Sequence, residues 1–389
     1  MKVVYLFSYN PALPGVLKKI NDKIIQMRAS GAEVTGLAIC NADAAIPTQN
    51  SEIYFLPVKF TPPRWLQYGP LKILAYLKKS RSAVVSLERA LHEINPDVVV
   101  MRYGTANLFF ARIMKRFRFV FEHNTKEVEQ LAMHYNGWRK SGWEKATVFY
   151  IEKYFSSRIL RRAAGIVGVT NEITQYELKR AGKEIPSITI ANGIDTSRCK
   201  RSSAGTYTDG TLHLLFLAGV AASWHGVDRL LKSIQPQHDV KVWLAGSFLQ
   251  SDIELAGKLG DKVEFTGMLK GDELDALFDK VHIAVASLAP ERVGITEMSA
   301  LKVREYAARA VPFITAFDDP DLNEELNADF WLRVPSGNDE ISIDDLIAFA
   351  KRSTKPETRN ALSRFAQEHL DYTSKMQRLV EFLKKSIQK

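Results

Sequence analysis

Cysteine is scarce in this chain of 389 residues, which contains only two. Cys40 and Cys199 lie far apart and form no Cys-x-x-Cys pair, so we predict reduced thiols rather than a disulfide or a metal site. No apolar stretch reaches the roughly 18 residues that a membrane-spanning helix needs. The apolar run near the start, Val3 to Phe7, is shorter than the core of an export signal. We therefore expect a cytoplasmic protein.

Metal-binding patterns and unusual composition are also lacking. No group of His, Cys and Asp residues shows the spacing of a metal site, and we predict none. The apolar fraction of 46% and the charged fraction of 25% exclude a disordered or collagen-like chain. At about 150 residues per domain, the length predicts two to three domains.

Charge is distributed unevenly between the two halves. Residues 1–195 hold 28 Lys and Arg against 16 Asp and Glu, a balance of +12, whereas residues 196–389 hold 25 against 28, a balance of −3. A basic half favours an anionic partner, such as an anionic lipid, nucleic acid or a phosphorylated substrate. Because no nucleic-acid-binding motif accompanies the charge, we expect no nucleic-acid partner.

Short apolar runs alternate with segments of helical periodicity. This alternation predicts an α/β protein with two parallel sheets, each covered by helices on both faces, as in two Rossmann-like domains. The polar stretch 201–211 is interpreted as a linker. Expected strands are 3–7, 34–39, 53–58, 98–101, 119–121, 165–170, 188–191, 212–217, 240–245, 263–265, 282–286 and 312–316; expected helices are 16–30, 71–94, most of 127–162, 226–234, 272–279, 300–309 and 373–388.

In open parallel sheets, ligands bind beyond the carboxyl ends of the strands. With two such domains facing each other, the loops after the strands would line one cleft. These loops are 8–15, 102–107, 122–126, 219–225, 246–249, 267–271 and 287–298.

The most informative of these loops leads into a helix that carries acidic and basic residues. We predict Ser299 as the N-cap, which puts Glu297 in the loop and Glu305 in the second helical turn. Lys302 in the first turn is opposed by the helix dipole and suits a bound anion such as a phosphate. Carboxylates beside that anion suit sugar hydroxyls, since each accepts two of them. The alternative is a solvated helix face with a Lys–Glu pair.

Several motifs occur in order along the chain: Val167-Gly168-Val169-Thr170, Asn192-Gly193-Ile194-Asp195, FLAGVAASWHGVDRL at 216–230, Phe265-Thr266-Gly267, Glu297-x7-Glu305 and SALKVREYAA at 299–308. Together they resemble glycosyltransferase family 4, the retaining GT-B enzymes. The resemblance covers essentially the whole chain and implies a GT-B fold with residues 1–195 as acceptor domain, 196–370 as donor domain and 371–389 as a helix returning to the first domain.

The resemblance also implies a role for individual residues in binding a nucleoside-diphosphate sugar. Glu305 would hold the ribose, and Glu297 would face the sugar hydroxyls as a catalytic residue. The diphosphate would contact Lys302 together with the backbone around Ser299, Ala300 and Leu301. The turn of Phe265, Gly267, Met268 and Leu269 would hold the base, and Gly219 would let the backbone approach the phosphate because it lacks a Cβ.

Some positions depart from the family pattern. Val220 and His225 stand where an Arg and a Lys usually clamp the diphosphate, and neutral His225 would be a weaker substitute. Ala310 replaces the Gly that usually ends the Glu305 helix. The N-terminal Gly-Gly loop retains only Gly15.

In the first domain, the loop after one strand carries Glu122, His123 and Asn124. By resemblance, His123 would lie near the reacting sugar and is the candidate catalytic residue; alternatively, a backbone carbonyl binds it. Arg102 ends a neighbouring strand, where it would meet a phosphate or pair with Glu122. We place Gly15, Arg102 and Asn124 on the acceptor side.

The resemblance implies a mechanism without metal or further cofactor. The leaving phosphate takes the acceptor proton on the same face of the sugar, so the enzyme mainly positions its substrates and stabilises charge. The donor would be UDP- or GDP-linked. The acceptor of such relatives is often a lipid-linked or membrane-associated glycan, as in polysaccharide or glycolipid biosynthesis.

Two basic stretches with aromatic residues fit peripheral contact with an anionic membrane; a solvated helix face is the alternative. The first stretch, 59–89, includes Lys59, Trp65, Tyr68, Tyr76, Lys78, Lys79, Arg81 and Arg89; the second, 138–162, includes Trp138, Arg139, Lys140, Trp143, Lys153, Arg158, Arg161 and Arg162.

Other functions remain open. A nucleotide-sugar epimerase would need acid–base carboxylates, which the sequence does not identify. A catalytically silent paralogue that binds sugar nucleotide or glycan fits the two missing clamps. A two-domain solute-binding protein is disfavoured by the short apolar run at the start.

Overall fold

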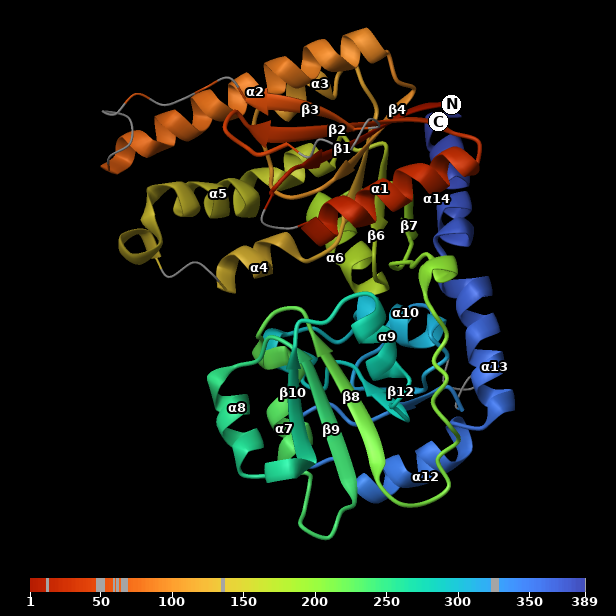
Figure 1. Cartoon of the computed structure of the whole chain (residues 1–389). Helices are drawn as coiled ribbons and strands as arrows, with labels where there is room; N and C mark the ends of the chain where they lie inside the picture. The colour runs from red at the N-terminus through yellow and green to blue at the C-terminus, as the bar shows by residue number, and fades with distance from the viewer. Residues whose placement is uncertain are drawn as a thin grey trace. The chain divides into compact units, whose positions relative to one another are not determined.

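The computed structural model describes residues 1–11, 14–46, 53–58, 60, 63, 69–133, 137–322 and 329–388. The chain forms two compact units (Figure 1). Unit 1 comprises Met1–Ile190 and Lys375–Lys389, and unit 2 comprises Ala191–Ser374. The chain thus passes between the units at 190/191 and 374/375. The predicted domain boundaries, 195/196 and 370/371, lie within a few residues of these positions.

Unit 1 is built on a seven-stranded parallel sheet in the order β3-β2-β1-β4-β5-β6-β7. Its inner strands are nearly continuous apolar runs, as expected for a sheet buried on both faces. In the register, Val3 pairs with Val34 on one side and Val98 on the other. The strands are β1 (Lys2–Ser8), β2 (Glu33–Asn41), β3 (Ile53–Val58), β4 (Val98–Arg102), β5 (Phe119–His123), β6 (Gly165–Gly168) and β7 (Ser187–Thr189).

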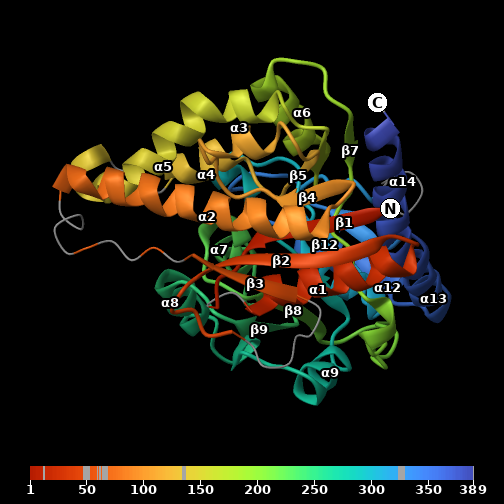
Figure 2. The ribbon, with the colours of Figure 1, turned by 90° about the horizontal axis from the view of Figure 1, so that it is seen from above.

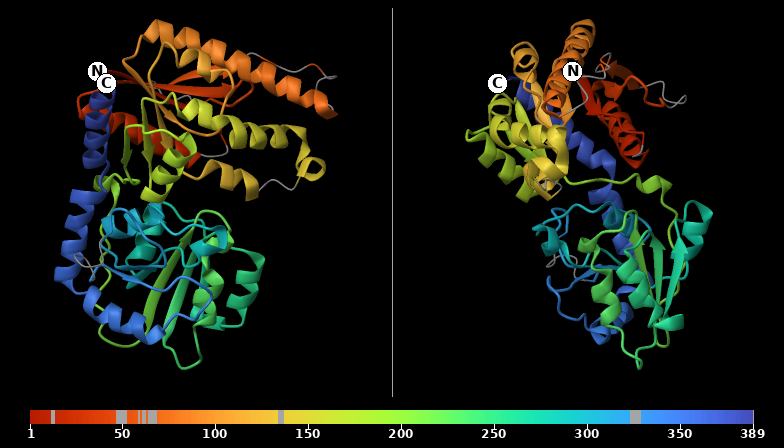
Figure 3. Two further views of the ribbon diagram at one scale, coloured as in Figure 1. Left: turned by 180° about the vertical axis from the view of Figure 1, so that it is seen from behind. Right: turned by 90° about the vertical axis from the view of Figure 1, so that its left-hand side faces the viewer.

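Helices cover both faces of the unit 1 sheet. On one face α2 (Lys72–Ile94) packs beside α3 (Phe110–Ile113) and α5 (Gly137–Leu160), as Figure 2 shows. The other face is covered by α1 (Pro14–Ala29) and by α14 (Tyr372–Gln388) at the end of the chain (Figure 3). Apolar residues of both helices belong to one core. The remaining elements are η2 (Gly69–Leu71), α4 (Glu127–Met133) and α6 (Asn171–Ala181).

Unit 2 contains a six-stranded parallel sheet in the order β10-β9-β8-β11-β12-β13. One core packs α7, α8 and α12 on the sheet, and a second packs α9, α10 and α13 on the other face. The strands are β8 (Leu212–Ala218), β9 (Val240–Gly246), β10 (Val263–Gly267), β11 (Ile283–Val285), β12 (Phe313–Thr315) and β13 (Trp331–Arg333). The helices are α7 (Val227–Lys232), α8 (Gln250–Gly257), α9 (Asp272–Phe278), α10 (Leu301–Ala308), α12 (Ile343–Ser353) and α13 (Pro356–Phe365); the short turns are η3 (Thr196–Arg198), η4 (Ser223–His225), η5 (Gly260–Lys262), η6 (Pro290–Val293) and η7 (Ala366–Leu370).

The interpretation of 201–211 as a linker is wrong. Tyr207 is buried, and Ser202 donates its hydroxyl hydrogen to the Phe278 carbonyl at 2.7 Å. Arg359 Nη2 in turn donates to Ser202 Oγ at 3.2 Å. Polar composition concealed these contacts because the residues bond to partners far away in sequence.

Several elements escaped the sequence analysis: α6, α8, α12, α13 and the three-residue strand β13. No helix among the described residues combines the length and apolarity required to cross a membrane.

Candidate functional site

The loop before α10 is tied to the start of unit 2. Ser299 Oγ accepts a hydrogen bond from the Asn192 backbone N–H at 2.7 Å, and Asn192 Nδ2 donates to the Ser299 carbonyl at 2.6 Å. The N-cap of α10 is Ala300, which makes no side-chain cap bond, so the prediction of Ser299 as N-cap is wrong. Because the hydroxyl is used elsewhere, the amides of Leu301 and Lys302 in the first turn have no side-chain cap.

Arg304 of α10 is fully buried and binds groups outside the helix. Its Nε donates to the Asn192 carbonyl at 2.9 Å, and its Nη atoms bind Asp319 and Asp321. Asp319-Pro-Asp321 is an Asp-x-Asp sequence that the prediction of a metal-free site left out of account. Both carboxylates bind this guanidinium, so the motif here joins α10 to the loop after β12.

Lys302 lies in the first turn of α10 and is partly buried. Its Nζ lies 3.4 Å from His225 Nδ1 and 4.6 Å from the centre of the Phe216 ring. Burial lowers the pKa of the Lys302 ammonium to about 7. Among the described residues Lys302 makes no ion pair, so the first turn of α10 carries a desolvated cation without a counter-charge.

His225 ends η4 and is itself buried. Its Nδ1 lies 3.2 Å from Ser287 Oγ, after β11. Burial, together with the charge of Lys302, lowers the pKa of His225 to about 4. His225 is therefore neutral at pH 7 and gives Lys302 a hydrogen-bond acceptor, a different role from the cationic clamp of the family pattern.

The segment around His225 is fixed to the loop after β11. The Leu288 N–H donates to the His225 carbonyl at 2.9 Å. Gly226, with φ 66°, is required there, since a Cβ would lie 2.9 Å from Leu288 Cβ. Gly219 differs, because a Cβ on it would meet open space. Contacts within the chain therefore do not explain Gly219.

The two predicted carboxylates flank the first turn of α10 in sequence: Glu297 precedes it and Glu305 follows it. Glu305 Oε1 accepts from Arg309 Nε at 3.1 Å while its side chain stays 28% exposed, which rules out the predicted alternative of a Lys302–Glu305 pair. Arg309 also binds Asp275 at 2.6 Å. Glu297 is half-buried and forms a parallel bridge with Asp318. Both residues thus retain solvent-facing surface.

The predicted base-holding turn overlaps the end of β10, the edge strand of the sheet: Phe265 and Gly267 belong to the strand, and Met268 and Leu269 follow it. Phe265 is 41% exposed and contacts Phe248 edge-on, with ring centroids 5.8 Å apart. Gly267 has φ 69°, Met268 is 59% exposed, and Leu269 packs against the core. An exposed aromatic and an exposed thioether offer apolar surface at the carboxyl edge, as a nucleobase needs.

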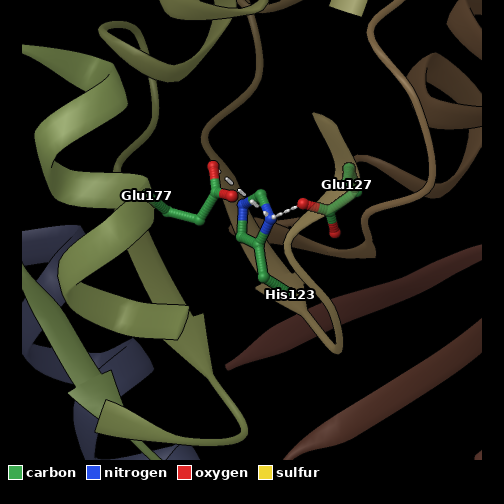
Figure 4. A group of neighbouring side chains, drawn as sticks. All are labelled: His123, Glu127 and Glu177. Atoms are coloured by element: carbon green, nitrogen blue, oxygen red, sulfur yellow. Dashed lines mark hydrogen bonds and ion pairs between the residues drawn. The ribbon is translucent and has the colours of Figure 1, made fainter. Parts of the chain in front are cut away.

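In unit 1, His123 ends β5 with no exposed surface. Its Nδ1 lies 3.1 Å from Glu127 Oε2 and 3.8 Å from Glu177 Oε2, and its ring stacks on Tyr103 at 4.5 Å (Figure 4). Carboxylates, rather than the backbone carbonyl of the alternative interpretation, contact Nδ1, while Nε2 is buried without a hydrogen-bond partner among the described residues. With no exposed surface, the His123 ring offers no atom for direct contact with a bound molecule.

Arg180 is the cation of this cluster. It binds Glu177 at 2.8 Å and Glu152 at 2.5 Å, and lies 3.8 Å from Glu127. Burial raises the pKa of Glu127 to about 8 and that of Glu177 to about 7, and burial lowers the pKa of His123 to about 4. Three buried carboxylates thus share one Arg, and two of them, Glu127 and Glu177, hold protons near neutral pH.

His123, Glu127 and Glu177 could geometrically hold a metal ion, since their ligand atoms lie within 4.8 Å of one another. Arg180 already supplies a positive charge to Glu177 at hydrogen-bonding distance. A divalent ion would have to displace or repel that guanidinium, and the retained protons offset the remaining charge. The donor set therefore does not favour a resident metal.

A second polar network lies at the ends of β1, β4 and β5. Glu122 is 1% exposed; Lys23 Nζ donates to its Oε1 at 2.7 Å, and Tyr5 OH donates to its Oε2 at 2.7 Å. Burial by itself would raise the pKa of Glu122, but the charges of Lys23, Lys19 and Arg102 outweigh it and lower the pKa.

Asn124 joins this network to the surface. Its Nδ2 donates to Glu122 Oε1 at 3.1 Å, while its Oδ1 accepts from Lys19 Nζ at 3.1 Å and from Arg102 Nη1 at 3.0 Å. Arg102 therefore binds Asn124 and does not form the predicted alternative ion pair with Glu122. Gly15 lies in the first turn of α1.

The basic stretches are partly described. The side chains of Lys59, Trp65, Tyr68, Trp138, Arg139 and Lys140 lie outside the described residues. On α5, Lys153 lies over the rings of Phe149 and Tyr154, and Arg158 lies 5.3 Å from the centre of Phe155. Tyr154 is 58% exposed.

Comparison with known proteins identifies a glycosyltransferase domain in the second half of the chain. Residues 211–348, about a third of the chain, match the sequence model of the family described as glycosyl transferases group 1. That region is a glycosyltransferase domain, and the prediction of a glycosyltransferase enzyme is confirmed. A search of curated proteins found no match.

Solved structures resemble the chain over its whole length. A sucrose-phosphate synthase from Thermosynechococcus elongatus is 13% identical, with a TM-score of 0.66 and 99% of each chain covered. A lipopolysaccharide outer core galactosyltransferase, WaaB, is 14% identical, with a TM-score of 0.63 and coverage of 99% and 100%. HepE of Anabaena with UDP-glucose is 15% identical, with a TM-score of 0.57 and coverage of 99% and 100%. The predicted GT-B fold of two Rossmann-like domains is confirmed; the placement in family 4 stays a prediction.

Proposed function

We propose that the chain transfers a sugar from a nucleoside-diphosphate sugar to a glycan or lipid-linked acceptor, with retention and without a metal or further cofactor. The observation that carries the proposal is Lys302. A lysine in the first turn of a helix raises the local positive charge, and burial without a counter-ion makes that charge costly. An anionic ligand explains its presence, since free amides and an ammonium together bind phosphate.

The surroundings of Lys302 fit the rest of such a donor. Glu297 and Glu305, which flank Lys302 in sequence, would supply hydroxyl acceptors, and exposed Phe265 and Met268 would supply apolar surface for the base. The HepE structures contain UDP and UDP-glucose, which supports a uridine nucleotide as the first donor to test. Lys302 held by neutral His225 would replace the two clamps missing from the family pattern.

The burial of His123 supports retention by internal proton return. Buried His123, with a pKa of about 4, is a poor base. If the leaving phosphate takes the acceptor proton, no stronger base is required, and the site has only to position the substrates and stabilise the diphosphate charge.

We propose that the acceptor lies at the inner surface of a membrane. Support comes from α5, where exposed Tyr154 and half-exposed Phe155 lie beside Lys153 and Arg158. Aromatic rings and cations together suit an anionic lipid surface. Binding to anionic liposomes should weaken when Arg158, Arg161 and Arg162 are neutralised together; equal binding would contradict this surface.

The deciding experiment is nucleotide binding by calorimetry, followed by product analysis. The protein is titrated with UDP, GDP, ADP and CMP, with and without EDTA, and then incubated with the matching sugar nucleotide. We expect one nucleoside diphosphate to bind regardless of EDTA and the released sugar to keep the donor's anomeric configuration by NMR. Nucleotide binding without turnover would favour a silent paralogue. Conversion of the donor sugar into its epimer would favour an epimerase. Loss of binding in EDTA would contradict metal independence.

A further inference from the structure

Two loops at the carboxyl edge of the unit 2 sheet are held against each other. One follows β8 and contains η4, and the other follows the neighbouring strand β11 and contains η6. The backbone N–H of Leu288 in the second loop donates to the His225 carbonyl in the first at 2.9 Å. The side chains meet at the same junction, where His225 Nδ1 lies 3.2 Å from Ser287 Oγ. The placement of the His225 ring therefore depends on how the two loops are joined.

Arg292 of η6 joins the loops a second time, through its guanidinium. Nη1 and Nη2 donate to the two carboxylate oxygens of Asp228, in the first turn of α7, at 2.7 and 3.1 Å. Nη1 also donates to the carbonyl of Ser223, the first residue of η4, at 3.1 Å. Nη2 also donates to Asn338 Oδ1 at 3.2 Å. Ser223 and Asp228 stand on either side of His225 in the chain, so Arg292 holds both ends of the segment that carries this histidine.

The bond between Arg292 and Asp228 is better suited to fixing a position than to stabilising the fold. Their side chains remain 24% and 25% exposed, and ion pairs this accessible to water contribute little to global stability. Cohesion of the loops comes from inside, where buried Arg229 donates from Nη1 to the Leu288 carbonyl at 2.9 Å. The two-pronged bond of a guanidinium to a carboxylate fixes orientation as well as distance. The outer pair thus adds precision to a junction that is already closed.

Precision matters here because of what the His225 ring contacts. Its Nδ1 lies 3.4 Å from Lys302 Nζ, already longer than the usual hydrogen-bond range of about 2.7 to 3.2 Å. The same ring packs edge-on against Phe216, with centroids 6.0 Å apart, and Lys302 Nζ lies 4.6 Å from the centre of the Phe216 ring. A shift of η4 by about an ångström would therefore separate the imidazole from the ammonium.

We propose that Arg292 is a positioning residue of the donor site. Through Ser223 and Asp228 it fixes η4, so that His225 holds Lys302 where the diphosphate binds. Arg292 acts through these groups and not on the nucleotide, because both of its terminal nitrogens are already bonded within the chain. The role in donor binding rests on the proposed function, whereas the fixing of η4 does not.

The first test measures UDP affinity by calorimetry in the full-length protein. Arg292→Met and Asp228→Asn should each weaken UDP binding by about 10-fold, within the loss that misplacing a binding group by an ångström causes. The double variant should be no weaker than the worse single variant, because both changes break one link. Arg292→Lys, which keeps the charge but loses the fork, should recover part of the affinity. Lys232→Met is the matched control, since it also removes a cation from Asp228, at 3.3 Å, but within α7 itself.

The second test needs no ligand and follows the titration of His225 by NMR of the histidine side chains, assigned with His225→Gln. Burial and the charge of Lys302 lower the pKa of His225 to about 4. If Arg292 fixes η4, Arg292→Met should let the ring reach water and raise this pKa toward the ordinary value of 6.5. Lys232→Met should leave the titration unchanged. Asp228→Asn, which keeps the shape of the side chain, replaces Arg292→Met if that variant does not unfold cooperatively.

The two measurements together decide the role of Arg292. Unchanged UDP affinity and unchanged His225 titration would overturn the proposal. Weaker UDP binding with an unchanged titration would indicate direct contact between Arg292 and the nucleotide, and a shifted titration with unchanged affinity would confine the link to loop structure; either result overturns the positioning role. If the wild-type protein binds no nucleoside diphosphate, the proposed function fails, and the titration alone decides whether Arg292 fixes η4.

Discussion

The two units bury charge in opposite ways. In unit 1, three carboxylates and His123 surround Arg180, and protons held by Glu127 and Glu177 balance the cluster from within. In unit 2, Lys302 is desolvated beside neutral His225 with no carboxylate against it. A charge balanced by its own chain stabilises the fold, whereas an unbalanced charge at a sheet edge indicates a ligand.

This difference teaches caution about pKa shifts as markers of function. His123 and His225 both have a pKa lowered to about 4 by burial, yet their neighbours differ in kind. His123 lies among acidic groups linked to Arg180, while His225 bonds Lys302, a lysine in the first turn of α10. The neighbouring charges, more than the shift itself, distinguish a structural network from a binding site.

The largest expected effect comes from removing the cation of the unit 1 cluster. Arg180→Met should destabilise the protein by about 3–5 kcal/mol, since it leaves buried carboxylates without a partner. Denaturant unfolding at pH 7.5 measures this loss. Lys179→Met, on the exposed neighbouring position, is the control. A loss below about 1 kcal/mol would mean that protonation alone balances the cluster.

Removing the buried cation of unit 2 should leave stability unchanged and weaken nucleotide binding. Lys302→Met removes a desolvated cation, so we expect an unchanged or higher melting temperature. Nucleotide affinity should fall by about 10- to 100-fold, as for a lost charge-assisted bond. Calorimetry measures the affinity, with exposed Lys270→Met as control. Undiminished affinity would remove Lys302 from the donor site.

The pH dependence of stability should differ in sign between the two clusters. Glu127 and Glu177 hold protons in the folded state to about pH 8 and 7, so their contribution to stability falls as pH rises from their usual pKa of 4.5 through these values. The pKa of His123 is lowered in the folded state, so its contribution to stability rises with pH only below pH 6.5. Lys302 is deprotonated more easily when folded, so its contribution rises from pH 7 toward 10.5.

Unfolding from pH 6.5 to 8.5 tests these slopes in variants. Glu127→Gln should flatten the falling contribution, which amounts to at most about 1.4 kcal/mol per pH unit for one proton. Lys302→Met should remove the rising one. Identical profiles for wild type and both variants would show that neither cluster titrates in this range.

The smallest expected effect concerns the residue after a helix. Gly182 follows α6 with φ 60°, and Ala310 follows the last turn of α10 with φ 58°. Because an alanine at positive φ is strained, Ala310→Gly should stabilise the protein by up to about 1 kcal/mol, less what the buried methyl group contributes. Gly182→Ala should destabilise it. Urea midpoints of the two variants should move in opposite directions.

Periodicity predicted most of the sheets. The strand at 53–58 and most other predicted strands agree with the structure within a few residues, because a sheet buried on both faces imposes continuous apolar runs. Amphipathic α6 and α12 were overlooked although their N-caps, Thr170 and Ser342, are local signals readable from sequence. The three residues of β13 carry too little pattern to be recognised.

Within the candidate sites, local rules failed where distant partners compete. Ser299 looks like an N-cap, but its hydroxyl bonds to Asn192, more than a hundred residues earlier in the chain. Lys302 and Glu305 look like a helical pair, but Arg309 takes the carboxylate. Nothing in the spacing around His123 revealed Glu177 or Arg180, because the chain reaches them only through the following strand and helix.

The sequence by itself determined the α/β class, the alternation of strands and helices, and which residues stand at the strand ends, because hydrophobic period and turn chemistry act over a few neighbours. Only the tertiary structure decided which charges are balanced. Arg180 among its three carboxylates, Lys302 beside His225, and Arg292 against Asp228 are pairings between distant segments. Burial sets the energy of such pairings, and burial exists only once the sheets and helices have packed.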